Sequence, residues 1–180
     1  HFLFQKRGGD IRQPGEICFP GGQHDIEDSD CKETAIRETV EELGICSDKI
    51  ELIGNLDTII VPAGTTIDSF LAVAHIDDLD ELDINEAEVA EVFTIPVEYF
   101  EKNEPKEYQA VVKVCPSYIN EEGKEVTLFP ANELGVSNMY TKPWGDHKYP
   151  LLVYERYKGY LVWGLTARLV QDVIKYLKTD

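Results

Sequence analysis

The sequence predicts a mixed α/β fold, and three observations lead to this class. Apolar and β-branched segments alternate with segments of helical periodicity along the 180 residues. A capped helix is expected over residues 31–43, and a second amphipathic helix is expected from Thr166 to about Lys178. We therefore expect a mixed β-sheet between helices, and the chain length is typical of a single domain covering residues 1–180.

The helix over residues 31–43 has signals at both ends. Asp30 can cap its N-terminus, and Glu33 three residues later completes a capping-box pattern. Gly44 stands where a helix usually ends in a left-handed residue. Between these ends, apolar side chains recur at spacings near 3.6 residues, at Ala35, Ile36, Val40 and Leu43.

The other elements follow from the same kinds of pattern. Strands are expected at residues 2–6, 50–56, 58–62, 69–76, 89–95 and 108–114. A short helix is expected after Pro96, over residues 97–101, and the acidic run 77–86 reads as a surface loop. Hairpin turns are expected at residues 120–123 and around Lys158-Gly159, the second joining 148–157 to 160–163. Thr166 is expected to cap the last helix.

The charge balance excludes some partners. The chain has 34 acidic and 17 basic residues, for a net charge of −17. A protein this acidic does not bind nucleic acid or an anionic membrane nonspecifically. It also repels an anionic substrate at long range, so a phosphate-containing substrate needs local help from a metal ion, basic side chains or backbone N–H groups.

The cysteines and the chain start bear on cellular context. Cys18, Cys31, Cys46 and Cys115 lack zinc-type spacing, which favours reduced thiols in a cytoplasmic protein. No run of about 18 apolar residues exists, so no transmembrane helix is expected. The sequence starts at His1 directly in strand-like sequence, so we expect a missing N-terminal segment, and a monomer or a homodimer.

Three carboxylates gather on the first helix. Glu38 and Glu42 are i,i+4 neighbours, with Cβ atoms roughly 5–6 Å apart, and Glu41 lies on the adjoining strip. Arg37 is i,i+4 from Glu41 and can hold its carboxylate in place. Such a cluster repels itself unless a cation neutralises it, and hard oxygen ligands suit Mg²⁺ or Mn²⁺. A solvated acidic helix face is the alternative for a bare Glu-Glu pair.

A glycine-rich turn precedes this helix. Phe19-Pro20-Gly21-Gly22 ends 15 positions before Arg37, and its two glycines let backbone N–H groups approach an anion. Arg12 is a candidate to meet substrate phosphates. Lys6 and Arg7 are weighed equally as phosphate contacts and as ordinary surface charge.

This combination resembles the Nudix hydrolases, whose motif has the form G-x5-E-x7-R-E-U-x-E-E-x-G-U, with U an apolar residue. Residues 37–45 match its second half, with Thr39 in place of an apolar residue. Gly22 lies one residue too far upstream, and Ser29 occupies the position of the first Glu, so Asp28 or Asp25 must take its role. The resemblance implies an α/β/α sandwich with a mixed sheet and metal-dependent pyrophosphate hydrolysis.

The upstream segment resembles one branch of that family, the coenzyme A pyrophosphatases, in which an arginine precedes Gly-x3-Phe-Pro-Gly-Gly. Here Gly15 begins this motif, and Arg12 stands one residue from the expected arginine position, which is Ile11. The branch implies cleavage of coenzyme A or its derivatives to 3′,5′-ADP and 4′-phosphopantetheine. Two alternatives are a Nudix pyrophosphatase for another dinucleotide such as ADP-ribose or NADH, and a non-catalytic nucleotide-binding Nudix domain.

Roles can be assigned on this hypothesis. Mg²⁺ or Mn²⁺ is expected on Glu38, Glu41 and Glu42, and the catalytic set is Glu41, Glu38 and Arg37. Substrate binding is assigned to Arg12, Gly21 and Gly22. The general base is left open between Glu41, Glu38 and a carboxylate of the 86–91 loop, where Glu88 is a possible extra ligand beside Glu86 and Glu91.

Two further features are weighed in the same way. His24, His75 and His147 show no metal-ligand spacing and are interpreted as structural. The segment 140–149, which contains Trp144, is equally consistent with stacking on a nucleotide base and with packing on the core.

Overall fold

The computed structural model describes residues 1–62 and 64–178 and confirms the mixed α/β class. Within these residues the helices are α1 (Cys31–Leu43), α2 (Val97–Lys102) and α3 (Gly164–Leu177), and the 3₁₀ helices are η1 (Ser47–Lys49), η2 (Leu79–Glu81) and η3 (Asn138–Thr141). The strands are β1 (Phe2–Arg7), β2 (Ile17–Cys18), β3 (Ile50–Asn55), β4 (Ile59–Ile60), β5 (Thr66–Ile67), β6 (Phe70–Ala74), β7 (Val89–Ile95), β8 (Lys106–Val114), β9 (Ser117–Ile119), β10 (Glu125–Thr127) and β11 (Trp144–Val153).

The chain forms two compact units. One consists of His1–Glu107 together with Leu152–Asp180, and the other consists of Tyr108–Leu151. The second unit is therefore inserted into the sequence of the first, shortly before the last helix. The expectation of one domain over the whole chain stays a prediction.

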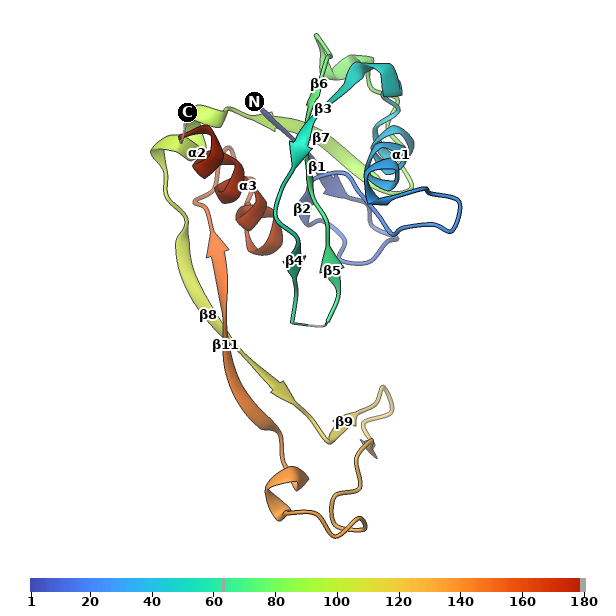
Figure 1. Ribbon diagram of the computed structural model, residues 1–180, viewed down its shortest axis with the longest axis vertical. Helices are drawn as coiled ribbons and strands as arrows, with labels where there is room; N and C mark the ends of the chain where they lie inside the picture. The colour runs from blue at the N-terminus through green and yellow to red at the C-terminus, as the bar shows by residue number, and fades with distance from the viewer. Residues whose placement is uncertain (63, 179–180) are drawn as a thin grey trace. The chain divides into compact units, whose positions relative to one another are not determined.

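The first unit is built on β1, which pairs with β2 on one side and β7 on the other. Both pairings are antiparallel and place Gln5 opposite Cys18 of β2 and Val92 of β7. Two further antiparallel pairs, β3 with β6 and β4 with β5, complete the described sheets of this unit (Figure 1). The position of Gln5 at the centre of the three-stranded sheet is important for the site.

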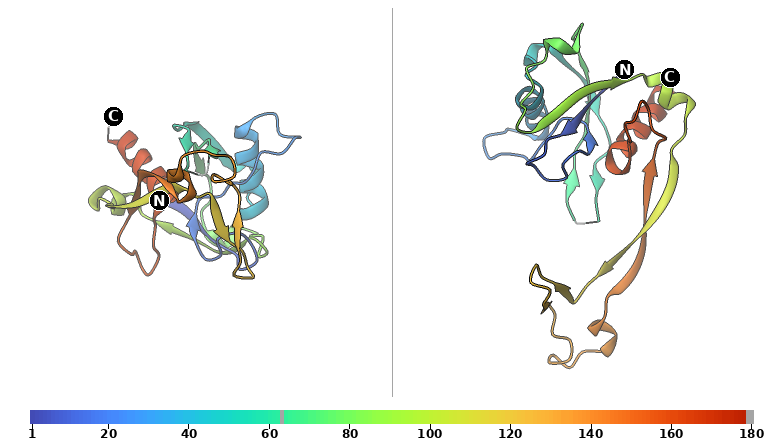
Figure 2. Two further views of the ribbon diagram at one scale, coloured as in Figure 1. Left: turned by 90° about the horizontal axis from the view of Figure 1, so that it is seen from below. Right: turned by 180° about the vertical axis from the view of Figure 1, so that it is seen from behind.

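Helices cover both faces of the three-stranded sheet. Side chains alternate across a strand, so Phe2 and Phe4 point to one face of β1 and Gln5 to the other. The phenylalanine face joins the main core, which includes Phe93 and the buried side of α3. Figures 1 and 2 show α1 on the opposite side of β1 from α2 and α3. This is the layered α/β/α arrangement that the family resemblance implies.

The second unit contains two antiparallel features. β8 pairs with β11, and Figure 1 shows these two strands in opposite directions. β9 pairs with β10 through the predicted turn, where Gly123 N donates to Asn120 O at 2.9 Å. The Trp144 ring meets the Tyr140 ring edge-on, with ring centroids 5.2 Å apart. This contact lies within the segment 140–149 itself, so packing of Trp144 on the core and stacking on a base both stay untested.

The structure also corrects several local expectations. Helix α3 begins at Gly164, and Thr166 is no cap, because its buried hydroxyl donates to the carbonyl of Ile17 on β2 at 2.9 Å. The expected strand over 148–157 ends at Val153, and two isolated antiparallel bridges, Val153 with Trp163 and Tyr157 with Tyr160, continue the hairpin. The two-residue strand β2 escaped prediction because it is too short to show alternation.

Candidate active site

Helix α1 carries most of the predicted site residues and has the predicted ends. The Asp30 side chain accepts a hydrogen bond from Glu33 N at 2.8 Å, and Gly44 ends the helix with φ 64°. Glu33 accepts from Ser29 N, at 2.7 Å, instead of closing a capping box on Asp30. The two caps set the register of the helix, and with it the direction in which Arg37 and the glutamates project.

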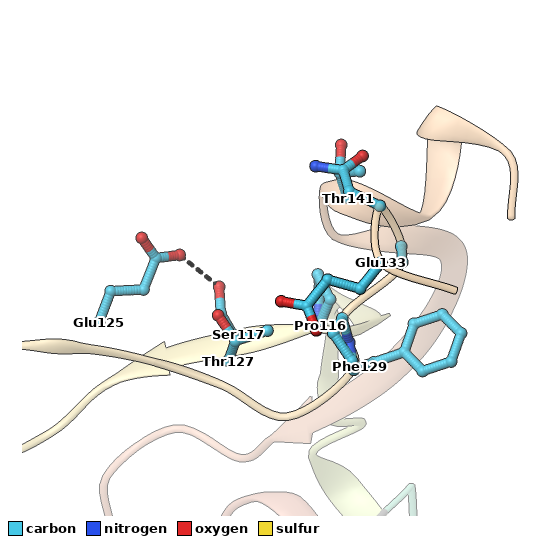
Figure 3. A pocket seen from close by; sticks show the side chains of 10 residues that line it. Pro116, Ser117, Glu125, Thr127, Phe129, Glu133 and Thr141 are labelled. Atoms are coloured by element: carbon cyan, nitrogen blue, oxygen red, sulfur yellow. Dashed lines mark hydrogen bonds between the residues drawn. The ribbon is translucent and has the colours of Figure 1, made fainter. Parts of the chain in front are cut away.

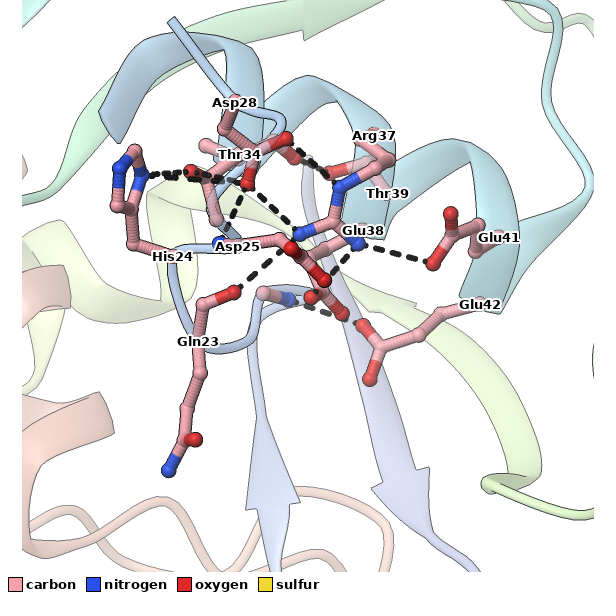
Figure 4. A network of polar contacts seen from close by, with 12 residues as sticks. Gln23, His24, Asp25, Asp28, Thr34, Arg37, Glu38, Thr39, Glu41 and Glu42 are labelled. Carbon is pink, nitrogen blue, oxygen red and sulfur yellow. Dashed lines mark hydrogen bonds and ion pairs between the residues drawn. The ribbon is translucent and has the colours of Figure 1, made fainter. Parts of the chain in front are cut away.

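Of the two aspartates that the sequence offers in place of the first motif glutamate, Asp28 pairs with Arg37. Arg37 donates to both of its carboxylate oxygens, from Nε at 2.9 Å and from Nη2 at 3.0 Å (Figure 4). Asp28 also accepts from Thr34 Oγ1 at 2.8 Å and from Asp25 N at 2.9 Å. The Arg37 guanidinium, together with the Asp25 N–H, holds the pKa of Asp28 well below its usual range. Asp28 is therefore an ionised anchor for Arg37.

Arg37 links this anchor to two of the predicted metal ligands. Its Nη1 lies 3.0 Å from Glu38 Oε1 and 3.0 Å from Glu41 Oε2. The i,i+4 contact with Glu41 is the one that the helical spacing predicted. Figure 4 shows the guanidinium between Asp28 on one side and Glu41 on the other. Arg37 thus holds the carboxylates of Glu38 and Glu41 in position.

Glu42 differs from the other glutamates because it is buried, with 3% of its surface exposed. Its Oε2 accepts a hydrogen bond from Gly21 N at 2.9 Å, so the anion that this glycine turn meets is a side chain of the protein itself. Burial raises the pKa of Glu42, the Gly21 N–H and the Gln5 amide lower it, and the carboxylates of Glu38 and Glu88 raise it further.

Gly22 leaves room for a close approach of the Glu38 side chain. A Cβ atom at this position would lie 2.2–2.4 Å from the carboxylate atoms of Glu38. The second glycine of the turn therefore leaves the space that the Glu38 carboxylate occupies, and the two glycines have separate functions. Gly21 donates to Glu42, and Gly22 makes room for Glu38.

Glu88 approaches the cluster from the loop before β7. Asn85 N, in the same loop, donates to Glu42 O at 3.0 Å, which ties the loop to the end of α1. The Glu88 carboxylate contributes to the raised pKa of Glu42. The Glu88 carboxylate itself accepts a hydrogen bond from Asn85 Nδ2 at 3.4 Å, and its role as an extra metal ligand stays a prediction. Glu91 instead accepts a hydrogen bond from the Tyr160 hydroxyl.

The predicted substrate contact at Arg12 lies apart from this network. Arg12 is exposed in the loop between β1 and β2, and its carbonyl accepts from Arg7 Nε at 2.8 Å. Among the described residues, no hydrogen bond or ion pair joins its side chain to the acidic cluster. The structure thus brings together Arg37, the three helix glutamates and the two glycines, while the role of Arg12 stays a prediction.

The cluster has the chemistry of a divalent-cation site. Its carboxylates are hard oxygen donors, which Mg²⁺ and Mn²⁺ prefer. Within residues 1–62 and 64–178, no group of three or more His, Cys, Asp or Glu side chains is arranged to hold a metal ion. Glu38 and Glu41 are instead paired with Arg37, and Glu42 with Gly21. The three glutamate carboxylates are ligands of the kind that such a cation binds, and in this structure their oxygens are paired with Arg37 and Gly21.

Two residues near the cluster were missed by the sequence analysis. Thr34 supports Asp28, and its Oγ1 lies 2.9 Å from His24 Nδ1, at the edge of the network. Gln5 follows the three apolar residues that begin β1 and is 1% exposed. Its polarity at a central strand position was the available signal.

A separate hollow of about 200 Å³ lies in the second unit (Figure 3). It is lined by residues that include Phe129, Glu133 and Thr141, and Ser117 Oγ on its wall donates to Glu125 Oε1 at 2.6 Å. None of the predicted catalytic or metal-binding residues lines it. The acidic cluster of α1 therefore remains the candidate active site.

No described helix is both long enough and apolar enough to cross a bilayer. All four cysteines are free thiols.

Comparisons with known proteins show the family of the chain. The model of the NUDIX domain matches residues 1–115. The peroxisomal coenzyme A diphosphatase NUDT7 of Mus musculus is 36% identical over 103 residues, which cover 56% of this chain and 42% of that protein. The mitochondrial coenzyme A diphosphatase NUDT8 of Homo sapiens is 35% identical over 97 residues, covering 54% of this chain and 41% of that protein.

A longer match extends beyond the first unit. The uncharacterized Nudix hydrolase NudL of Enterobacter sp. (strain 638) is 27% identical over 172 residues, covering 95% of this chain and 72% of that protein. The chain spans less than half the length of the mouse and human proteins. Since the NUDIX domain covers more than half of the sequence and its motif residues form one network on α1, the chain belongs to the Nudix hydrolase family.

Proposed function

We propose that the protein hydrolyses the pyrophosphate bond of coenzyme A or its derivatives, giving 3′,5′-ADP and 4′-phosphopantetheine, with Mg²⁺ or Mn²⁺ as its cofactor. The observation that carries the hydrolytic part is the network in which Asp28 anchors Arg37 and Arg37 orients Glu38 and Glu41. A solvated acidic helix face has no need of a buried anchor or of a glycine that makes room for one carboxylate.

In this proposal Glu38, Glu41 and Glu42 would hold the cation, which would supply positive charge beside the pyrophosphate and lower the pKa of a water. Arg37 restrains Glu38 and Glu41, so the carboxylates are oriented before substrate arrives. The water oxygen forms a bond to one phosphorus while the bond from that phosphorus to the bridging oxygen breaks. Its proton passes to a carboxylate, for which Glu41, Glu38 and Glu88 are the candidates.

The choice of coenzyme A rests on two supports. The segment from Arg12 to Gly22 resembles the coenzyme A pyrophosphatase branch. Two of the relatives are named as coenzyme A diphosphatases. The partner is accordingly a small dinucleotide-type molecule, and the protein is a monomer or a homodimer. The cytoplasmic location stays a prediction, since the names of these relatives place them in peroxisomes or mitochondria.

A product assay tests the proposal. The full chain is incubated with coenzyme A, an acyl-coenzyme A, ADP-ribose or NADH, each with Mg²⁺, with Mn²⁺ and with excess chelator, and products are separated by chromatography. We expect 3′,5′-ADP from coenzyme A, no turnover in chelator, and recovery when the cation is restored. Full turnover in chelator refutes the metal-dependent mechanism. Faster turnover of ADP-ribose than of coenzyme A refutes the substrate assignment and leaves the hydrolytic proposal standing.

A further inference from the structure

The amide of Gln5 is buried beside the acidic cluster without a protein partner. Gln5 is 1% exposed, and neither its Nε2 nor its Oε1 has a hydrogen-bond partner among the described residues. Most buried polar side chains in folded proteins are paired, and each exception calls for an explanation. An amide at this depth without partners costs stability, so a simple structural role does not account for it.

The position of the amide suggests what it serves. Gln5 lies on the face of β1 opposite the phenylalanine core, and its neighbour across the ladder is Cys18, three residues before Gly21. Gly21 donates to Glu42, the one buried glutamate of the cluster. The Gln5 amide is close enough to lower the pKa of both Cys18 and Glu42. The Gln5 amide therefore extends from the central strand β1 toward the buried carboxylate of Glu42.

We propose that Gln5 is a positioning residue for the cation site, whose unpaired amide hydrogen-bonds the Glu42 carboxylate and a water of the occupied site. This inference rests on the proposed function. Mg²⁺ and Mn²⁺ keep several waters when proteins bind them, and those waters need polar partners of their own. A buried amide with a donor and an acceptor available is such a partner. The free chain carries the unpaired amide at a cost, and the occupied site removes that cost.

The test compares Gln5→Met with the parent chain. Methionine has similar length and flexibility but no amide, so it fills the space without an unpaired group. We expect the metal-free melting temperature to rise by about 2 °C or more, because the unpaired amide is gone. We expect Mn²⁺ affinity, measured by calorimetry and by electron paramagnetic resonance, to fall by about 10–100-fold. Neither measurement depends on turnover.

Thr166→Val is the matched control. Thr166 is also buried, and its hydroxyl donates to Ile17 O, next to Cys18 on the same strand. This substitution leaves a carbonyl without its partner, so the melting temperature should fall while Mn²⁺ affinity stays within threefold of the parent. The two variants are thus expected to change stability in opposite directions and to separate stability from metal affinity.

Each outcome is decisive. Mn²⁺ affinity of Gln5→Met within threefold of the parent overturns the positioning role alone. A fall in its metal-free melting temperature like that of Thr166→Val shows that the amide is structural, which also overturns the proposal. Gln5→Leu is made in parallel, and failure of both variants to fold has the same meaning. A parent chain that binds no Mn²⁺ instead refutes the cation site of the proposed function itself.

Discussion

Arg37 donates two parallel hydrogen bonds to Asp28, from Nε to Oδ1 at 2.9 Å and from Nη2 to Oδ2 at 3.0 Å. The Asp28 side chain is 4% exposed, whereas that of Arg37 is 30% exposed. A bidentate pair of this kind fixes the plane of the guanidinium as well as its position. The remaining donor, Nη1, is thereby directed at Glu38 and Glu41.

Asp28→Asn should lower both stability and activity at neutral pH. The folded-state pKa of Asp28 lies below the usual 3.8, so ionised Asp28 stabilises the fold above that pH. This contribution is lost as the pH falls through the folded-state pKa. The gap in melting temperature between parent and variant should therefore be full at neutral pH and narrow below pH 3.8. Asp10→Asn, in an exposed turn, is the control, and a gap independent of pH would contradict the assignment.

Glu42→Gln should lower kcat by on the order of 10²–10⁴-fold, because it removes a charged ligand while keeping shape. Folding should survive and metal-free stability should rise. Burial raises the pKa of Glu42 in the folded state above its value in the unfolded state. The ionised carboxylate therefore lowers the free energy of unfolding once the pH exceeds these pKa values, and a neutral amide removes this penalty. Steady-state kinetics and thermal melts give both numbers. Activity within threefold of the parent would show that Glu42 is no ligand; Glu101→Gln on α2 serves as the control.

Gly22→Ala and Gly44→Ala should fail in different ways. The Cβ at Gly22 meets the far end of the flexible Glu38 side chain, so the carboxylate moves and the fold survives. We expect at least a tenfold loss of activity with little change in melting temperature.

At Gly44 the φ is 64° and the Cβ would lie 2.2 Å from Asp83 O, so the backbone itself must shift. That variant should lose more than about 1 kcal/mol of stability. Equal melting temperatures for the two variants would refute this distinction.

Arg12→Ala should raise KM for coenzyme A about tenfold or more and leave kcat near the parent value. A charge-assisted hydrogen bond to phosphate contributes roughly 1.5–3 kcal/mol at most, and it is made to ground state and transition state alike. Lys32→Ala, at an exposed position on α1, changes net charge by the same amount and should leave KM within twofold. An equal rise in both variants would assign the effect to overall charge.

Local sequence determined a large part of this site. The bounds of α1, its Asp30 cap, its Gly44 end and the contact from Arg37 to Glu41 follow from short-range spacing and were predicted as observed. These features depend on residues within a few positions of one another, where helical geometry alone sets the distances. The apolar strands could be recognised for a similar reason, since alternation is a local property.

Tertiary structure decided which residues are buried and paired. Among three similar glutamates it buries Glu42, which accepts a hydrogen bond from Gly21 N in the turn that leaves β2, and leaves Glu41 exposed beside Arg37. In the folded chain Arg37 pairs with Asp28 and not with Asp25. Thr166 does not cap helix α3, because its hydroxyl donates to the carbonyl of Ile17 on β2. It also places the amide of Gln5 next to a carboxylate 37 positions away. Such contacts depend on how strands and helices pack across long separations, and hydrogen-bond partners at that range have no signature in local periodicity.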